Sequence, residues 1–298
     1  MNAHHPLHES IPEASNPLGI AGIEFIEYVT NQPLALGQAL EAMGFRAVAR
    51  HRSREITLYR QGGMNLVLNA HPDDARVGAT EGGGPVISAV GLRVRDARLA
   101  HQRCLDLGAW EVASHARAME LHIPAIHGPG GSRFYFVDRW QEFSIYDIDF
   151  TTIHDVDPRP PALAGMHYFG IVQYIGAGRS VDWITYYERL FGFELIPDDQ
   201  RFGIMPKGTL MRSPGAAGGS GFLWQLVEPV PSLEDESLLN ESLQRIGIGV
   251  PDVPAAVAAL TARGVSFVDS AELHPEDRGA LTRTVLGNVA FELVHQTS

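Results

Sequence analysis

The sequence is poor in cysteine, in basic residues and in long hydrophobic runs. Cys104 is the single cysteine among 298 residues, which excludes an internal disulfide, and we expect a reducing, cytoplasmic location. Lys and Arg number 23 against 35 Asp and Glu, which gives a net charge of −12. This balance argues against nucleic acid or an anionic membrane as a partner, because clustered cations bind phosphates. No apolar run reaches ~18 residues, so no membrane span is predicted.

An internal repeat divides the sequence into two halves. Three segments of the first half recur in the second, namely 22–28 as 165–171, 89–96 as 245–252 and 131–136 as 287–292. An Ala-rich helical run that ends in glycine follows each copy of the middle segment. We therefore expect two domains, 19–155 and 163–298. A disordered leader without a secretory signal, 1–18, is expected before them.

Each half contains two modules that read as a strand, a helix and then two or three strands. Hydrophobic periodicity and glycine stops predict helices over 35–43, 96–107, 180–190 and 253–263. The expected strands are 20–29, 56–59, 64–69, 86–94, 133–146, 167–174, 210–212, 222–227 and 289–295. The predicted fold class is α+β, with four βαβββ modules paired into two domains. Each half then encloses a concave cavity, which is a shape that suits a small ligand.

Polar side chains occupy the aligned positions of the repeat mainly in the second half. The alignment places Glu24 with His167, Ala89 with Arg245, and Phe136 with Glu292. Imidazole and carboxylate groups are common metal ligands. A function at these positions must therefore reside in the second half. The first half is expected to have a filled, apolar cavity and to support the second half or to form an oligomer interface.

Four such modules resemble the vicinal oxygen chelate superfamily, and within it the 4-hydroxyphenylpyruvate dioxygenase family. The resemblance covers about 19–296. Segments 50–53, 58–62, 65–69 and 135–138 are similar to the dioxygenase-like segment fused to some bacterial 3-dehydroshikimate dehydratases. In the second half the resemblance to the dioxygenase family rests on His167, on 183–193 and on Phe291-Glu292-Leu293-Val294. It implies two glyoxalase/dioxygenase-like domains and oxidation of a small aromatic keto acid.

The resemblance also implies a metal centre, in which two histidines and one glutamate hold Fe(II). Here His167 and Glu292 would be ligands of Fe(II) or another divalent metal. The second histidine follows a glutamine in the family, and this chain has Gln244-Arg245. A guanidinium offers no lone pair and repels a nearby cation. Gln225 and Glu228 lie on a strand that could supply a replacement ligand.

Two roles are open for Arg245. It can form an ion pair with Glu292, or it can bind the carboxylate of a substrate, with Gln244 and Gln225 as further substrate contacts. No catalytic residue is assigned.

Three functions are consistent with these patterns. The first is an oxidoreductase that acts on a small keto acid with a divalent metal. The second is a metal-free protein that binds a small carboxylate, with a regulatory role. The third is a partner of a dehydratase. A homo-oligomer, a dimer, is expected, as for the family.

Overall fold

The structure is a computed structural model that describes residues 16–71, 83–113, 120–141, 143–197, 208–215, 221–228, 241–268 and 279–296. Residues 1–15 of the expected leader lie outside this part of the chain. Of its remainder, Leu18 is buried in the core. No helix among the described residues is long and apolar enough to cross a membrane.

Strands of the first half form one eight-stranded mixed sheet. In spatial order these are β6 (Ala125–His127), β7 (Arg133–Val137), β5 (Val86–Arg93), β1 (Gly22–Val29), β4 (Met64–Asn69), β3 (Ile56–Gln61), β2 (Arg46–His51) and β8 (Phe150–Thr152). The central strand β1 pairs with β5 antiparallel and with β4 parallel. The helices are α1 (Pro33–Ala42), α3 (Ala97–Asp106) and the short α4 (Tyr146–Asp149).

Strands of the second half form a seven-stranded sheet with the same central arrangement. In spatial order these are β10 (Glu194–Leu195), β11 (Thr209–Arg212), β12 (Leu223–Val227), β9 (His167–Tyr174), β13 (Ser242–Val250), β15 (Phe291–His295) and β14 (Gly279–Leu281). Its helices are α5 (Ser180–Phe191) and α6 (Val253–Thr261). A 3-10 turn lies at Pro129–Gly131 in the first half, and another lies at Leu163–Gly165 at the start of the second.

Local sequence signals explain the helix ends. The side chains of Asp96 and Asp252 accept hydrogen bonds from the backbone N–H groups three residues later, which caps α3 and α6. Helix α5 ends where Gly192 adopts a left-handed conformation with φ 71°. The predicted α+β class is confirmed, and each predicted helix is found within about two residues of its expected ends.

One predicted strand was wrong in its second part. The strand expected over 133–146 ends at Val137, and a turn leads into α4 instead. The apolar residues Ile145 and Tyr146 are buried there in an irregular segment and a helix rather than in a sheet. An apolar run fixes burial more firmly than it fixes backbone conformation.

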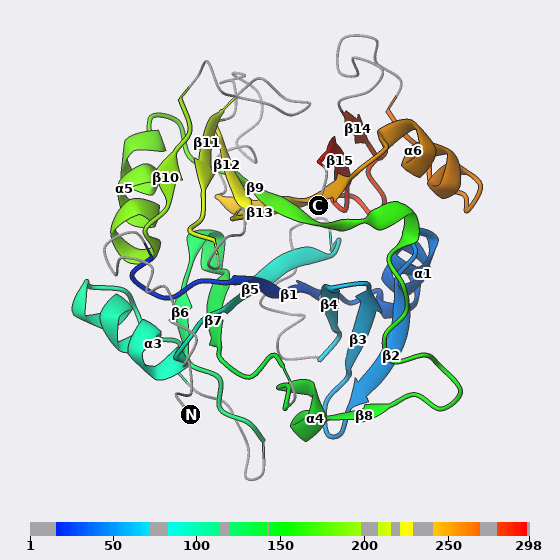
Figure 1. Cartoon of the computed structure of the whole chain (residues 1–298), viewed down its shortest axis with the longest axis horizontal. Coiled ribbons are helices and arrows are strands. Elements are labelled where there is room, and N and C mark those ends of the chain that lie inside the picture. The colour runs from blue at the N-terminus through cyan, green and yellow to red at the C-terminus, as the bar shows by residue number, and fades with distance from the viewer. Residues whose placement is uncertain are drawn as a thin grey trace, which may run out of the picture.

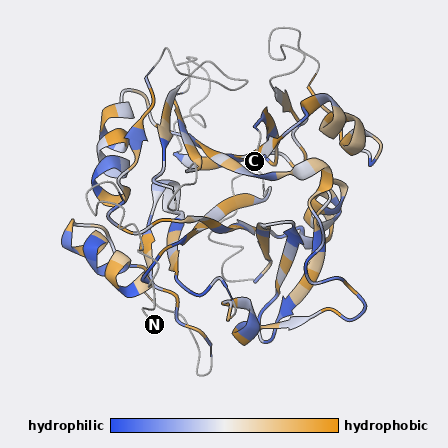
Figure 2. Cartoon of the chain, in the orientation of Figure 1, coloured by the Kyte–Doolittle hydropathy of each residue, from blue (hydrophilic) through white to orange (hydrophobic). Residues whose placement is uncertain are grey.

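The two sheets lie back to back, with helices at both sides (Figure 1). One continuous apolar core joins the halves, and Figure 2 shows hydrophobic residues along its strands and helices. Phe134 of the first half packs against Phe191 and Trp224 of the second, with ring centroids 5.0 and 5.6 Å apart. The other faces of the two sheets therefore point away from this shared core, and each can form a cavity of its own.

Candidate functional site

The outer face of the first sheet is filled, as the sequence led us to expect. Phe25, Ala89 and Val137 are buried there together with Ile145 and Tyr146 at the start of α4. The buried Glu24 has its Oε2 atom 2.6 Å from Nε of Arg93. Burial raises the pKa of the Glu24 carboxyl, and the Arg93 charge opposes that rise. Glu24 thus has a structural partner within its own half.

The hydrogen-bond register of the central strands tests the alignment of the repeat. In each half the central antiparallel strand pair, β1 with β5 or β9 with β13, contains two bulges, and three residue pairs lie between them. In the first half these pairs join Phe25–Glu27 to Ala89–Gly91, and in the second they join Gly170–Val172 to Arg245–Gly247. Arg245 is therefore equivalent to Ala89, as expected.

The other two expected alignments, Glu24 with His167 and Phe136 with Glu292, were wrong. The extra residue of the bulge is Glu24 on β1 and Phe169 on β9, so these two residues are equivalent. His167, two residues before Phe169, is therefore equivalent to Gly22 and not to Glu24. A two-residue shift keeps a side chain on the same face, so hydrophobic alternation does not reveal it.

Glu292 also has a different counterpart. Gly91 pairs with Tyr135, whereas the equivalent Gly247 pairs with Glu292. Tyr135, not Phe136, is thus equivalent to Glu292. This one-residue shift turns the side chain to the other face, and Phe136 accordingly lies in the shared core.

Two of the expected site residues form an ion pair on the second sheet. Nε of Arg245 on β13 lies 3.3 Å from Oε2 of Glu292 on the parallel neighbour β15. Both side chains are buried, with 7% and 6% of their surface exposed. The Nη2 atom of Arg245 is buried and has no hydrogen-bond partner among the described residues. A buried guanidinium nitrogen of this kind is a ready donor for an acceptor atom of a ligand.

A small cavity lies against Glu292. Gly170 and Gly247 pair with each other and line it. Gln225 on β12 lines the cavity too. Val172 on β9 lies between Gln225 and Arg245, because it pairs with Gln225 on one side and with Arg245 of β13 on the other. Its volume of about 30 Å³ accommodates one carboxylate group or a water molecule.

His167 lies in a different place. Its Nδ1 atom is 3.1 Å from the carbonyl oxygen of Gly165, and its Nε2 atom is 3.2 Å from Oε1 of Gln296. It lines a cleft of about 270 Å³ between the two halves rather than the cavity at Glu292. The described structure thus does not bring His167 and Glu292 into one cavity.

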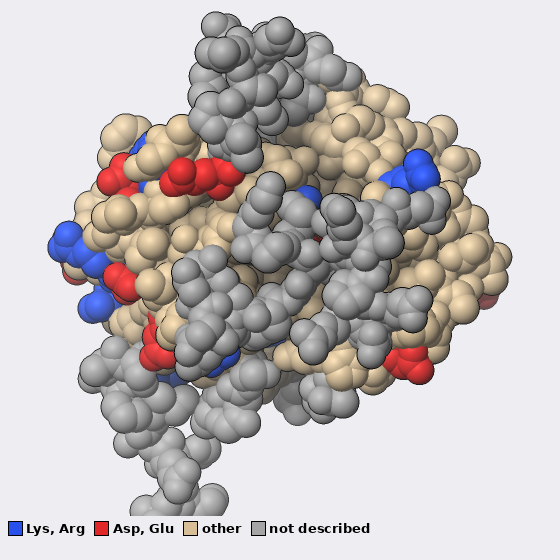
Figure 3. Space-filling view, turned by 90° about the horizontal axis from the view of Figure 1, so that it is seen from above, with Lys and Arg blue, Asp and Glu red and all other residues tan. Residues whose placement is uncertain are grey.

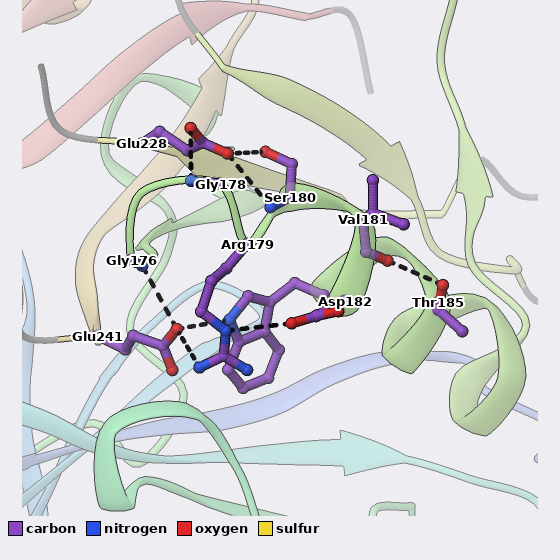
Figure 4. Close-up of polar contacts among 10 residues, drawn as sticks. Gly176, Gly178, Arg179, Ser180, Val181, Asp182, Thr185, Glu228 and Glu241 are labelled. Atoms are coloured by element: carbon purple, nitrogen blue, oxygen red, sulfur yellow. Dashed lines mark hydrogen bonds and ion pairs between the residues drawn. The ribbon is translucent and has the colours of Figure 1, made fainter.

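The two remaining candidates from the sequence lie at the margin. Gln244 sits in the bulge directly before Arg245 and is half-buried. Glu228 is exposed and caps helix α5, since its carboxylate accepts hydrogen bonds from Gly178 N and from Ser180 N and Oγ, as Figure 4 shows. Glu228 is therefore engaged away from Glu292, and it does not replace a missing ligand.

The donor set as a whole does not resemble a metal site. Within the described residues, no group of three or more His, Cys, Asp and Glu side chains is placed to hold a metal ion. Figure 3 views the second half from above, and much of the described surface there is uncharged, with many charged residues toward the edges. The buried Arg245 and Glu292 thus supply the charges of the site, and sequence reasoning identified both.

Comparison with known proteins agrees with the resemblance. Residues 14–151 match the family described as hydroxyphenylpyruvate dioxygenase, HPPD, N-terminal. The 4-hydroxyphenylpyruvate dioxygenase of Pseudomonas aeruginosa is 31% identical over 89% of this chain and 76% of its own length. That of Pseudomonas sp. (strain P.J. 874) is 41% identical over 61% of this chain, and the match spans about half (51%) of that relative. A 3-dehydroshikimate dehydratase of Pseudomonas aeruginosa is 32% identical over 83% of this chain and 40% of its own.

Solved structures agree on the fold. A xylose isomerase-like TIM barrel/4-hydroxyphenylpyruvate dioxygenase fusion protein superposes with a TM-score of 0.73, at 21% identity, over 98% of this chain and 52% of that one. This likeness supports two glyoxalase-like domains built from paired modules. With the sequence relatives, it leads to one assignment: the chain belongs to the 4-hydroxyphenylpyruvate dioxygenase family.

Proposed function

We propose that this protein binds a small aromatic keto acid in the second half through Arg245, without the metal that the family relatives suggest. The observation that carries the proposal is the buried pair of Arg245 and Glu292, in which one guanidinium nitrogen is left without a partner. The relatives named as 4-hydroxyphenylpyruvate dioxygenases support an arylpyruvate as the class of ligand. The halves 19–155 and 163–298 would serve as a supporting and a binding domain.

The residues fit an Fe(II) centre poorly. Glu292 has Arg245 as its cation, and Arg245 has no lone pair to give to a metal. A divalent cation at Glu292 would face a fixed positive charge about 4 Å away in a poorly screened site, which disfavours binding by several kcal/mol. We therefore derive no reaction step through a metal at this site.

The side chains present support recognition of an acid. Arg245 can donate a charge-assisted hydrogen bond from Nη2 to a carboxylate oxygen, while Nε remains bound to Glu292. The amide of Gln225 at the cavity wall can donate to a keto or carboxylate oxygen. Gln244, next to Arg245 on β13, is the third contact that we assign. Glu292 holds the guanidinium in place and offsets its charge.

A second candidate function is the metal-dependent dioxygenase that the family implies. One observation favours it. Contact between Nδ1 of His167 and the carbonyl oxygen of Gly165 fixes the ring as in metal sites, where the other nitrogen binds the metal. In this structure Gln296 faces that nitrogen. The two candidates differ in one measurable property, the affinity for a divalent metal.

Metal titration separates the two functions. Protein purified without chelators should contain less than stoichiometric metal and bind Co(II) or anaerobic Fe(II) weakly in calorimetry. Arg245→His removes the fixed positive charge and places an imidazole beside Glu292, and should raise the affinity by about two orders of magnitude or more. Arg245→Gln is the control, since it removes the charge without adding a strong ligand. Tight stoichiometric metal in the unchanged protein would overturn the metal-free proposal.

Ligand titration tests the acid-binding part. The protein should bind phenylpyruvate in calorimetry, and Arg245→Gln should weaken binding by about tenfold or more, because a charge-assisted hydrogen bond contributes roughly 1.5–3 kcal/mol. A control at an exposed arginine outside the cavity, Arg212→Gln, should leave the affinity unchanged. Equal affinities of the unchanged protein and of Arg245→Gln would contradict the role of Arg245.

A further inference from the structure

The second half offers two hollows of very different size on either side of one aromatic ring. Phe169 lines both the cavity at Glu292 and the larger cleft between the halves. It is half-buried and packs with an apolar cluster of Ile196, Leu210 and Leu223. It also occupies the bulge of β9, where two residues face one on β13. Such bulges redirect a side chain, and here the bulge places Phe169 between the two hollows.

The cavity at Glu292 is too small for a whole aromatic acid. Its volume of about 30 Å³ compares with ~300–1,000 Å³ for typical small-molecule sites. The cleft beside it has about 270 Å³, close to the lower end of that range. The two hollows share Phe169 in their walls, so an acid whose carboxylate enters the small cavity can place the rest of its bulk in the cleft.

The lining of the cleft suits an uncharged aromatic group. Ile23 and Met64 of the first half and Phe222 of the second supply apolar walls. Arg93 at its edge is bound to Glu24 at 2.6 Å and lies over the ring of Trp140, so its charge is balanced. His167 and Gln296 provide hydrogen-bonding groups suited to a ring hydroxyl.

We propose that the cleft between the halves receives the aromatic part of the acid whose carboxylate binds Arg245, and that Phe169 sets the size of acid admitted. This inference rests on the proposed function, because it takes the carboxylate at Arg245 as given. It makes the first half a part of the binding site through Ile23 and Met64, although its own cavity is filled. The ring of Phe169 must turn aside for the ligand to span both hollows.

Gly63 provides a way to fill the cleft without disturbing the fold. It lines the cleft, a Cβ atom built there meets nothing within 4 Å, and its backbone is outside the left-handed region. We would measure the binding of pyruvate and phenylpyruvate by calorimetry to the full chain and to Gly63→Phe. Gly63→Ala is the matched control, because its methyl group leaves the cleft open. Circular dichroism and thermal unfolding would verify that each variant is folded.

The expected pattern distinguishes the ring from the carboxylate. The unchanged protein should bind phenylpyruvate about tenfold or more tightly than pyruvate, because the cleft removes the apolar ring from water. Gly63→Phe should abolish this preference and leave pyruvate binding unchanged, and Gly63→Ala should behave as the unchanged protein. Phe169→Ala should increase the preference for phenylpyruvate, since it opens the passage between the hollows.

The outcomes separate this inference from the proposed function. If Gly63→Phe and Phe169→Ala both retain the original preference for phenylpyruvate, the cleft does not hold the ring, and this inference is wrong. If the unchanged protein binds neither acid, or if Arg245→Gln binds pyruvate as well as the unchanged protein does, the proposed function has failed at the carboxylate site. Loss of phenylpyruvate preference in Gly63→Phe, with pyruvate affinity kept, supports the inference.

Discussion

Replacement of Arg245 by methionine removes one member of a buried ion pair and leaves the other in place. The two side chains are only 7% and 6% exposed, and their Nε and Oε2 atoms are 3.3 Å apart. Glu292 would then be a buried carboxylate without its cation, which typically costs ~3–5 kcal/mol. Glu292→Leu alone should cost a similar amount, because it leaves the guanidinium unpaired.

The double variant Arg245→Met/Glu292→Leu provides the decisive comparison. Apolar replacement of both partners of a buried ion pair is often neutral or stabilising, by roughly 1–4 kcal/mol. The free energy of unfolding of the double variant should therefore be close to that of the unchanged protein. Additive effects would instead give a loss of ~6–10 kcal/mol, so the coupling energy should be several kcal/mol.

Urea unfolding followed by circular dichroism measures these differences, with the midpoint and the slope determined for all four proteins. An unchanged slope verifies that the same surface unfolds in each. A loss below ~1 kcal/mol in Arg245→Met is typical of an exposed pair and would refute the reasoning. Equality of the double loss with the sum of the single losses would refute it too, because the residues would then act independently.

Two further predictions concern the frame around the site. Hydrogen bonds from Ser180 and Gly178 lower the pKa of Glu228, so its contribution to stability is present above the ordinary value of 4.5 and is lost as pH falls below it. Glu228→Gln should therefore lower the urea midpoint at pH 7, and this difference should shrink as pH falls below 4.5. Gly130→Ala should lower the thermal midpoint by several degrees, since its Cβ atom would lie 1.8 Å from the Glu241 carbonyl oxygen of the other half at a φ of +59°.

Each of these predictions has an internal control. Asp182→Asn changes an exposed carboxylate on the same helix, and its effect should be smaller than that of Glu228→Gln. A constant difference between Glu228→Gln and the unchanged protein from pH 7 to pH 3 would contradict the capping role. For Gly130, Gly108→Ala also has a positive φ but no neighbour within 4 Å. Equal losses in both would show that backbone strain, not the contact between halves, is responsible.

Most of the secondary structure could be predicted because it follows from local features. Capping aspartates at 96 and 252, the glycine after α5 and the alternation of β9 act within a few residues of the chain. The repeat made the pairing of modules predictable as well. The column that holds Arg245 was aligned correctly, and the same bulge directly precedes it in both halves. The resemblance to the family, in which these two positions converge on one metal, also predicted that Arg245 and Glu292 lie close together, as they do.

Register and side-chain packing were decided only by the tertiary structure. Bulges at Glu24 and Phe169 shift the ladder by whole residues, and because a bulge depends on hydrogen bonds between strands far apart in sequence, no local pattern reveals it. For the same reason the position of His167 in the cleft, apart from Glu292, was not visible in the alignment. The sequence by itself determined which chemistry is available, a guanidinium where the family has an imidazole. Only the folded chain determined which groups share a cavity, since that depends on contacts among β9, β13 and β15 that form on folding.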